Sequence, residues 1–295
     1  MQEFDSRTAR LLPVRLRELW NDSQRNNWPA DEWCRRQNQE LNEFNAIWTR
    51  ALLLPSESDL VHSTLVELGR WRGISDLELV RQVCENALHA NKLDWQRRVD
   101  QKDVAQVEKY YDSADYYIDE LMWWHTLTED NSPLAYVAAL EFALLAGCKN
   151  YLDFGSGVGS GALLFRQHGF DVTLGDISNR MLSFCEYRFR RRGLRAAFLN
   201  LGHARLPEAT YEFITAMDVF EHLVDPVAAV EMLDRCLKPG GYVYGRFSGE
   251  EEEERPQHIV MDFQPVFARF ASLGFNEVFR DDWLWGHQVF RKPAQ

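Results

Sequence analysis

Three glycines at alternate positions follow a short apolar run in the middle of the chain. Residues 151–159 read Y-L-D-F-G-S-G-V-G, so that Asp153 comes just before Gly155, Gly157 and Gly159. Glycine is required where a chain turns sharply or where the backbone must approach a ligand closely. The apolar residues that follow predict a helix whose first N–H groups face a polar or negative ligand group. The pattern therefore predicts a strand-to-helix turn that holds a cofactor.

A carboxylate follows at the end of the next predicted strand. Asp176 lies 21 residues after Gly155, where it can accept hydrogen bonds from both hydroxyls of a ribose. Dinucleotide enzymes prefer the spacing G-x-G-x-x-G, whereas here the third glycine comes one residue early and Ser160 occupies the expected place. The spacing therefore opposes an NAD-type oxidoreductase. Glycines that serve only tight packing are the remaining alternative.

Two further motifs follow downstream. They are D-V-F-E-H-L at residues 218–223 and L-K-P-G-G at residues 237–241. With the glycine motif and L-G-D-I-S at residues 174–178, they make the chain from about Tyr110 onward resemble the class I S-adenosylmethionine-dependent methyltransferases. The stretch around His222 is similar to the quinone-biosynthesis type of O-methyltransferase. The resemblance implies S-adenosylmethionine as cofactor and a Rossmann-like α/β fold with a central, mostly parallel, seven-stranded sheet.

The same resemblance implies roles for residues of the cofactor site. Asp153 and the turn from Gly155 to Gly159 would hold the methionine part of the cofactor. Asp176 would bind the ribose, and Ile177 would pack on the adenine. Asp218, at the end of the fourth strand, would lie beside the cofactor near its methyl group.

One position departs from the family pattern. The family often has an acidic residue just after the third strand, where it binds the adenine amino group. Gly202 falls at that position here. We therefore expect backbone groups or His203 to make this contact.

Two histidines are candidates for catalysis. Methyl transfer is an in-line displacement at a sulfonium, so the protein mainly positions the acceptor and excludes water. An oxygen acceptor usually needs a base or a metal as well, and histidine titrates near neutral pH. His222 follows the fourth strand and His258 follows the fifth, so we expect one of them, beside Asp218, to be the base. A brace for the next helix at His222 and an exposed loop position for His258 are the alternatives. We assign no metal ligand.

These residues need a parallel sheet to position them. From residue 151 on, short apolar runs alternate with helical stretches, which predicts strands covered by helices on both faces. Ser178 and the pair Asp225-Pro226 are typical helix starts. The strands are expected at residues 151–154, 172–174, 196–199, 213–217 and 242–247, with 277–280 and 284–290 closing the sheet as a hairpin-like pair.

The front of the chain follows a different pattern. Trp33, Gln37, Leu41, Phe44 and Trp48 recur at spacings of three or four, and strand alternation is absent. We therefore expect a helical domain over residues 1–105 and a methyltransferase domain over residues 106–295. The helical domain could be a lid, a homodimer surface or a dock for a carrier protein. The aromatic residues between 110 and 125 would either line the acceptor pocket or seat the helices on the sheet.

Composition excludes several classes of partner. The net charge of −12 opposes broad nucleic-acid binding, and the arginines from Arg188 to Arg195 are expected to complement the negative end of a helix. Five widely spaced cysteines oppose a disulfide framework and a structural zinc site. No apolar run approaches a membrane span, so a cytoplasmic location is expected. The acidic run from Glu250 to Glu254 is expected to be a solvated loop.

The sequence thus predicts a methyltransferase that acts on a small molecule or biosynthetic intermediate. A cofactor-binding structural or regulatory protein, or other sulfonium chemistry on the same fold, is the alternative. The acceptor atom stays open among oxygen, nitrogen, sulfur and carbon. We expect the acceptor pocket at the carboxyl edge of the sheet, between residues 110–126, 218–223 and 248–259.

Overall fold

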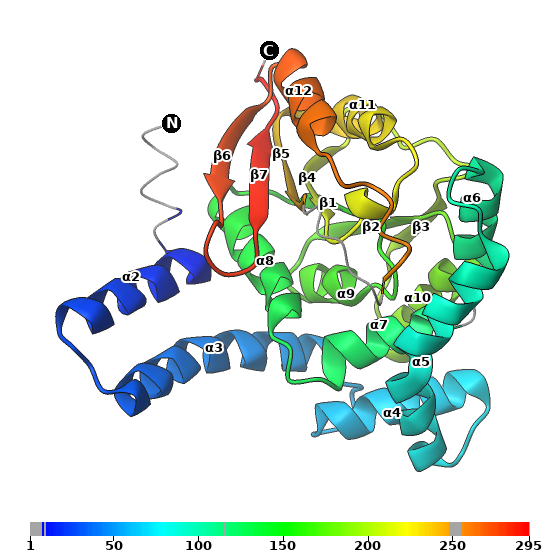
Figure 1. Cartoon of the computed structure of the whole chain (residues 1–295), viewed down its shortest axis with the longest axis horizontal. Coiled ribbons are helices and arrows are strands. Elements are labelled where there is room, and N and C mark those ends of the chain that lie inside the picture. Colours follow the sequence, from blue (N-terminus) through cyan, green and yellow to red (C-terminus); the bar gives the residue numbers. More distant parts are fainter. Residues whose placement is uncertain (1–7, 9, 115, 248–254, 295) are drawn as a thin grey trace.

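A seven-stranded sheet forms the centre of the protein, with the strand order β3-β2-β1-β4-β5-β7-β6 (Figure 1). The computed structural model describes residue 8 and residues 10–114, 116–247 and 255–294. Strands β1 to β5 are parallel, and β7 is antiparallel to both β5 and β6. This arrangement confirms the predicted Rossmann-like sheet and its antiparallel end. The strands are β1 (Asn150–Phe154), β2 (Asp171–Asp176), β3 (Ala197–Asn200), β4 (Tyr211–Ala216), β5 (Leu237–Arg246), β6 (Asn276–Arg280) and β7 (His287–Arg291).

Helices occupy the chain before the sheet, and none of the described residues before Asn150 belongs to a strand. In Figure 1, α2 and α3 extend to one side of the sheet, while α4, α5 and α6 lie at the other. The helices continue past residue 105, so a domain boundary there stays a prediction. They are α2 (Leu12–Arg25), α3 (Ala30–Leu52), α4 (Leu60–Arg72), α5 (Leu77–Arg98), α6 (Val104–Ser113) and α7 (Tyr117–Thr126).

The remaining helices cover the two faces of the sheet. Residues alternate between the faces of a strand: Phe213 of β4 packs in the core with α8 and α9, and Ile214 packs in the core with α11 and α12. Both residues are fully buried. The sheet is therefore a buried central layer, as its apolar strands predict. These helices are η1 (Ser132–Leu134), α8 (Ala135–Leu145), α9 (Ser160–Gln167), α10 (Asn179–Arg191), η2 (Phe220–His222), α11 (Pro226–Cys236) and α12 (Gln264–Ser272).

A buried ionic cluster joins the front helices to the sheet. Arg188 of α10 is 0% exposed and donates from Nε to Glu67 of α4 at 3.2 Å, while Arg192 pairs with the same carboxylate. Arg188 also donates to the carbonyl of Val158 at 2.7 Å and to Ser160 Oγ at 3.0 Å. The expectation that these arginines only complement a helix end was wrong for Arg188 and Arg192. Both arginine side chains are buried because they pair with Glu67 of α4, which is distant in the sequence.

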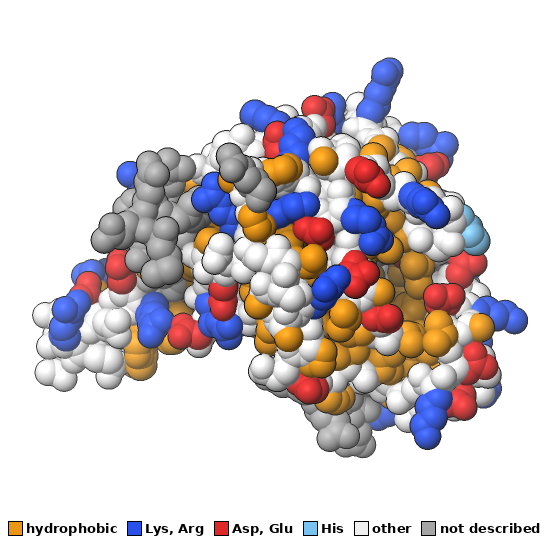
Figure 2. Space-filling model, turned by 90° about the horizontal axis from the view of Figure 1, so that it is seen from above, with side chains coloured by type: hydrophobic (Ala, Val, Ile, Leu, Met, Phe, Trp, Pro, Cys, Tyr) orange, Lys and Arg blue, Asp and Glu red, His pale blue; other side chains and the backbone are white. Residues whose placement is uncertain are grey.

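The surface shows mixed charge. On the face in Figure 2, Lys and Arg side chains are interspersed with Asp and Glu, and the surface is hollowed over hydrophobic side chains. The described helices include none that is both long and apolar enough to cross a bilayer. All five cysteine thiols are free, in line with the absence of a disulfide framework.

Candidate functional site

A cavity of about 1640 Å³ opens at the carboxyl ends of the central strands. This is more than one drug-sized ligand needs, since such pockets measure about 300–1,000 Å³. The glycine turn and the ends of β2 and β3 line one part. The turn after β4, residues 255–258, helices α6 and α7, and the β6–β7 connection line the rest. The cavity thus has room for a cofactor and a second molecule, at the edge of the sheet where we expected it.

The glycine turn is shaped by close contacts as well as by backbone conformation. Gly155, Gly157 and Gly159 have φ values of +69°, +50° and +71°, which favour glycine. A Cβ on Gly155 would lie 2.5 Å from Cγ2 of Val219. Gly155 and Gly157 line the cavity, whereas Gly159 is not among the lining residues and packs against Cys185. Gly159 therefore serves the turn rather than the cavity surface.

The structure does not bring Asp153 to the cavity. Its carboxylate is 0% exposed, accepts from Thr215 Oγ1 at 3.0 Å and from the N–H of Ala162 at 3.0 Å, and is not among the lining residues. Burial raises the pKa of Asp153 to about 7. The expected direct contact with the methionine part is therefore corrected: Asp153 holds the start of α9 to β4, beneath the turn.

Asp176 lies at the cavity, at the end of β2. One carboxylate oxygen accepts from the N–H of Gly157 at 2.9 Å, and the other accepts from the N–H of Ser178 at 2.9 Å. Burial raises the pKa of Asp176 to about 6. Each oxygen retains lone-pair capacity toward the cavity, so this carboxylate ties the glycine turn to β2 and can still accept from a ligand.

Ser156 adds a polar atom that the sequence pattern did not single out. The residue is buried and lines the cavity, and its Oγ has no hydrogen-bond partner among the described residues. Buried hydroxyls are normally paired. The turn thus presents an unsatisfied hydroxyl where a polar ligand group would fit.

The turn after β3 closes this end of the cavity. Ile177, Asn200, Gly202 and His203 all line it, and Asn200 donates from Nδ2 to the carbonyl of Ile177 at 3.0 Å. His203 is exposed. The adenine contact of His203 or the backbone of Gly202 stays a prediction. Asn200, which the motif comparison passed over, is a further polar candidate here.

Asp218 and Arg246 lie toward the other end. Asp218 has a φ of +51°, a strained conformation that non-glycine residues adopt most often at functional sites. Its carboxylate accepts from Arg246 Nη1 at 3.0 Å. Both residues line the cavity, so Asp218 has a cation beside it, and its place near the methyl group of the cofactor stays a prediction.

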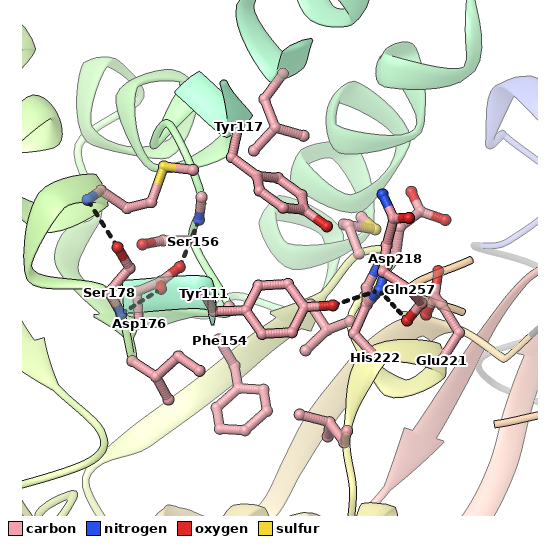
Figure 3. A pocket seen from close by; sticks show the side chains of 18 of the residues that line it. Tyr111, Tyr117, Phe154, Ser156, Asp176, Ser178, Asp218, Glu221, His222 and Gln257 are labelled. Carbon is pink, nitrogen blue, oxygen red and sulfur yellow. Dashed lines mark hydrogen bonds between the residues drawn. The ribbon is translucent and has the colours of Figure 1, made fainter. Parts of the chain in front are cut away.

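His222 and His258, the two candidates for the catalytic base, lie next to each other. Their ring centroids lie 4.8 Å apart, and both residues line the cavity. Nδ1 of His222 lies 3.1 Å from the carbonyl oxygen of Gln257 and 3.0 Å from the hydroxyl of Tyr111. In Figure 3 the Tyr111 ring lies between Asp176 on one side and His222 on the other. Asp225, not His222, caps α11, accepting from the N–H of Ala228 at 2.8 Å.

The protonation state of His222 follows from its surroundings. Burial lowers the pKa of His222 to about 3, and the adjacent His258 acts in the same direction. A neutral imidazole results at neutral pH. It can accept a proton or bind a metal through the nitrogen that carries no hydrogen.

The aromatic segment contributes to the cavity wall and to the packing of the helices. Tyr111, Tyr117, Trp124 and His125 line the cavity. Tyr110 instead is buried among the helices and donates to the carbonyl of Asn91 at 3.0 Å. The helical front of the chain therefore forms one wall of the site.

Several lining residues were missed from the sequence. Glu221 and Gln257 stand beside the two predicted histidines, and residues 282–287 of the β6–β7 connection form a further wall. Glu221 lies inside the D-V-F-E-H-L motif at residues 218–223. A carboxylate at that place in the sequence could have been predicted to lie at the site. The β6–β7 connection carried no comparable pattern. The predicted wall at 248–259 is described only from Arg255 on, and the acidic run at Glu250 to Glu254 lies outside the described residues.

Comparison with known proteins supports the motif-based resemblance. Residues 123–264 match a family model described as a methyltransferase domain. Over 145 residues the chain is 28% identical to the ubiquinone biosynthesis O-methyltransferase of Aliivibrio fischeri strain MJ11 and 30% identical to that of Azoarcus sp. strain BH72. Each match covers 48% of this chain, and they cover 62% and 61% of those relatives. The chain thus spans less than two thirds of the length of these relatives.

A solved structure of similar fold is the SAM-bound magnesium protoporphyrin IX methyltransferase of Synechocystis PCC 6803. It is 16% identical, with a TM-score of 0.49, and the match covers 65% of this chain and 96% of that one. The match over residues 123–264 agrees with the predicted family. The two ends of the chain lie outside that match.

Proposed function

We propose that this chain, whose residues 123–264 are a methyltransferase domain, transfers the methyl group of S-adenosylmethionine to an oxygen of a small molecule. The observation that carries the proposal is the single cavity shared by two sets of groups. The glycine turn and Asp176 lie at one end, and Asp218, His222 and His258 lie at the other. One end suits a ribose and an amino-acid group, and the other suits an acceptor that must lose a proton.

The residues at the cofactor end fit the cofactor. Asp176 offers carboxylate oxygens to ribose hydroxyls, and Ser156, whose Oγ is unsatisfied among the described residues, lines the same cavity. The close contact between Gly155 and Val219 leaves no space for a side chain on the turn. When bound, S-adenosylmethionine supplies an electrophilic methyl group on a sulfonium.

The residues at the acceptor end position the acceptor and accept a hydrogen bond from it. Trp124, Tyr136 and Trp285 line the cavity and would exclude water from the reacting groups. His222 is neutral at neutral pH because burial lowers its pKa to about 3. Such an imidazole is free to accept hydrogen bonds from an acceptor hydroxyl, and His258 lies beside it.

Calorimetric titration tests the cofactor assignment. We expect S-adenosylmethionine and S-adenosylhomocysteine to bind with one site per chain, and NAD not to bind. A screen of hydroxyl-bearing small molecules for methyl incorporation then tests the reaction. Binding of NAD alone would overturn the proposal. Cofactor binding without transfer to any acceptor class would favour the alternative of a binding protein or other sulfonium chemistry.

A further inference from the structure

We propose that Glu221, His222 and His258 bind a divalent transition-metal cation at the acceptor end of the cavity. One ligand atom from each of these residues lies within 4.8 Å of the others. All three residues line the cavity. In a tetrahedral site with ligand distances of about 2.1 Å the donor atoms are ~3.4 Å apart, so atoms at the 4.8 Å limit would have to approach one another by roughly 1.4 Å.

The fold holds the three residues together through the backbone. Glu221 and His222 belong to η2, directly after β4, whereas His258 follows β5. The N–H groups of Ile259 and Val260 both donate to the carbonyl of Glu221, at 2.8 and 3.1 Å. These bonds fix the segment of His258 against η2, so the cluster does not depend on a chance approach of long side chains.

The hydrogen bond of His222 is the kind that metal-binding histidines make. A carbonyl oxygen can only accept, so Nδ1 of His222 carries the hydrogen and donates it to Gln257 at 3.1 Å. This assignment leaves Nε2 with its lone pair. Metal-binding histidines regularly donate their second ring nitrogen to a carbonyl or carboxylate, which orients the ring.

Gln257 supplies a second, independent sign of a ligand. The residue is 1% exposed and lines the cavity, yet its Oε1 has no hydrogen-bond partner among the described residues. A buried amide oxygen without a partner is costly and points to an ion or a water at that place. A water on a bound cation would satisfy it.

The ligand set selects the cation. Two imidazoles and one carboxylate suit Zn²⁺, Fe²⁺ and Co²⁺, whereas Mg²⁺ prefers oxygen ligands alone. Three protein ligands leave at least one position open. An open position would be available to an acceptor, because all three residues line the cavity.

The role of the cation rests on the proposed methyl transfer. An acceptor hydroxyl bound to the cation has a lowered pKa and loses its proton to solvent near neutral pH. The oxygen then forms a bond to the methyl carbon, and the S–CH₃ bond breaks with its electron pair staying on sulfur. The products are the methyl ether and S-adenosylhomocysteine, so no other reactant is needed.

The test is titration of the chelator-treated chain with Zn²⁺, Co²⁺ and Mg²⁺, followed by calorimetry and by the visible absorption of Co²⁺. We expect one ion per chain, bound at least 10-fold more weakly by His258→Ala and Glu221→Gln. His89→Ala, which removes an exposed histidine on α5, should bind as the wild type does. S-adenosylhomocysteine affinity, measured in the same samples, should stay within about twofold in His258→Ala and shows that this variant is folded.

Each outcome separates the metal site from the proposed function. Equal metal binding by wild type and His258→Ala, or none by either, would overturn the metal site. If S-adenosylhomocysteine still bound in that case, the cofactor assignment would stand and His222 and His258 would act as bases alone. Loss of S-adenosylhomocysteine binding in the wild type would instead count against the proposed function. Mg²⁺ binding as tightly as Zn²⁺ would overturn the choice of a transition metal.

Discussion

Replacing Asp176 with asparagine should weaken cofactor binding, and the amide nitrogen also loses the hydrogen bond from one of the two backbone N–H groups. In the wild type both carboxylate oxygens accept backbone N–H groups, from Gly157 and Ser178, and both retain capacity for ribose hydroxyls. The amide keeps one acceptor oxygen and loses the charge. Losing charge-assisted hydrogen bonds costs about 1.5–3 kcal/mol, so the affinity for S-adenosylhomocysteine should fall roughly ten- to hundredfold.

The same substitution should remove a pH dependence. Burial raises the pKa of Asp176 to about 6, and only the ionised form accepts hydrogen bonds at both oxygens. As the pH falls below about 6, binding has to displace a proton, and wild-type affinity should drop by up to about tenfold per pH unit. Asp176→Asn has no proton to displace, so its affinity should stay flat over this range.

Calorimetry with S-adenosylhomocysteine between pH 5 and 8 measures both effects. Asp171→Asn is a matched control, since it makes the same change at the exposed start of β2. Thermal unfolding of each protein without ligand checks that the fold is intact. Wild-type affinity in Asp176→Asn at pH 7.5, or the same pH slope in both proteins, would refute the ribose contact.

Three further substitutions test other parts of the molecule. His222→Ala should lower turnover by about 10²–10⁴-fold and leave S-adenosylhomocysteine affinity nearly unchanged, because the imidazole lies at the acceptor end; steady-state kinetics with an acceptor from the screen measures it. Glu67→Gln should lower the free energy of unfolding by about 3–5 kcal/mol, because Arg188 and Arg192 then lose their buried countercharge; urea denaturation measures it. Burial raises the folded-state pKa of Asp153 to about 7, so folding takes up a proton between about pH 4 and 7. Relative to Asp153→Asn, the wild type should therefore gain stability as the pH falls through this window, as thermal unfolding would show.

Two of these have a matched control. His89→Ala and Glu85→Gln change exposed residues of α5 and should leave turnover and stability as they are. Full turnover in His222→Ala would remove this histidine from the chemistry. An unfolding free energy in Glu67→Gln equal to that of Glu85→Gln would show that the cluster contributes nothing. Parallel stability curves for wild type and Asp153→Asn would mean that Asp153 is ionised in both folded and unfolded chains.

The sheet could be predicted because its pattern is local. Strand β4 was expected at residues 213–217 and runs over Tyr211–Ala216, and the pair β6 and β7 was expected as a hairpin-like end. Their apolar runs and the turn residues between them are readable in one stretch of sequence. The glycine turn and Asp176 were found for the same reason, since strand, turn and acid follow in order.

Contacts between distant residues could not be predicted in this way. Glu67 meets Arg188 across 121 positions, and composition gave no sign of which arginines would be buried. Asp153 has the type and place of a ligand-binding carboxylate, yet its partners Thr215 and Ala162 turn it inward. The β6–β7 connection lines the cavity because β7 is inserted antiparallel beside β5. This strand pairing cannot be predicted from a single sequence.

The buried Glu67–Arg188 pair has a consequence for the order in which the protein assembles. Synthesis releases α4 long before α10, so Glu67 lacks its partner until 121 further residues have been added. Until then the carboxylate must stay hydrated, because burying it alone is too costly. The front helices can therefore complete their packing only after α10 has been synthesised. Chains truncated before α10 should expose these helices to proteolysis, and the finished protein should unfold in one cooperative transition rather than domain by domain.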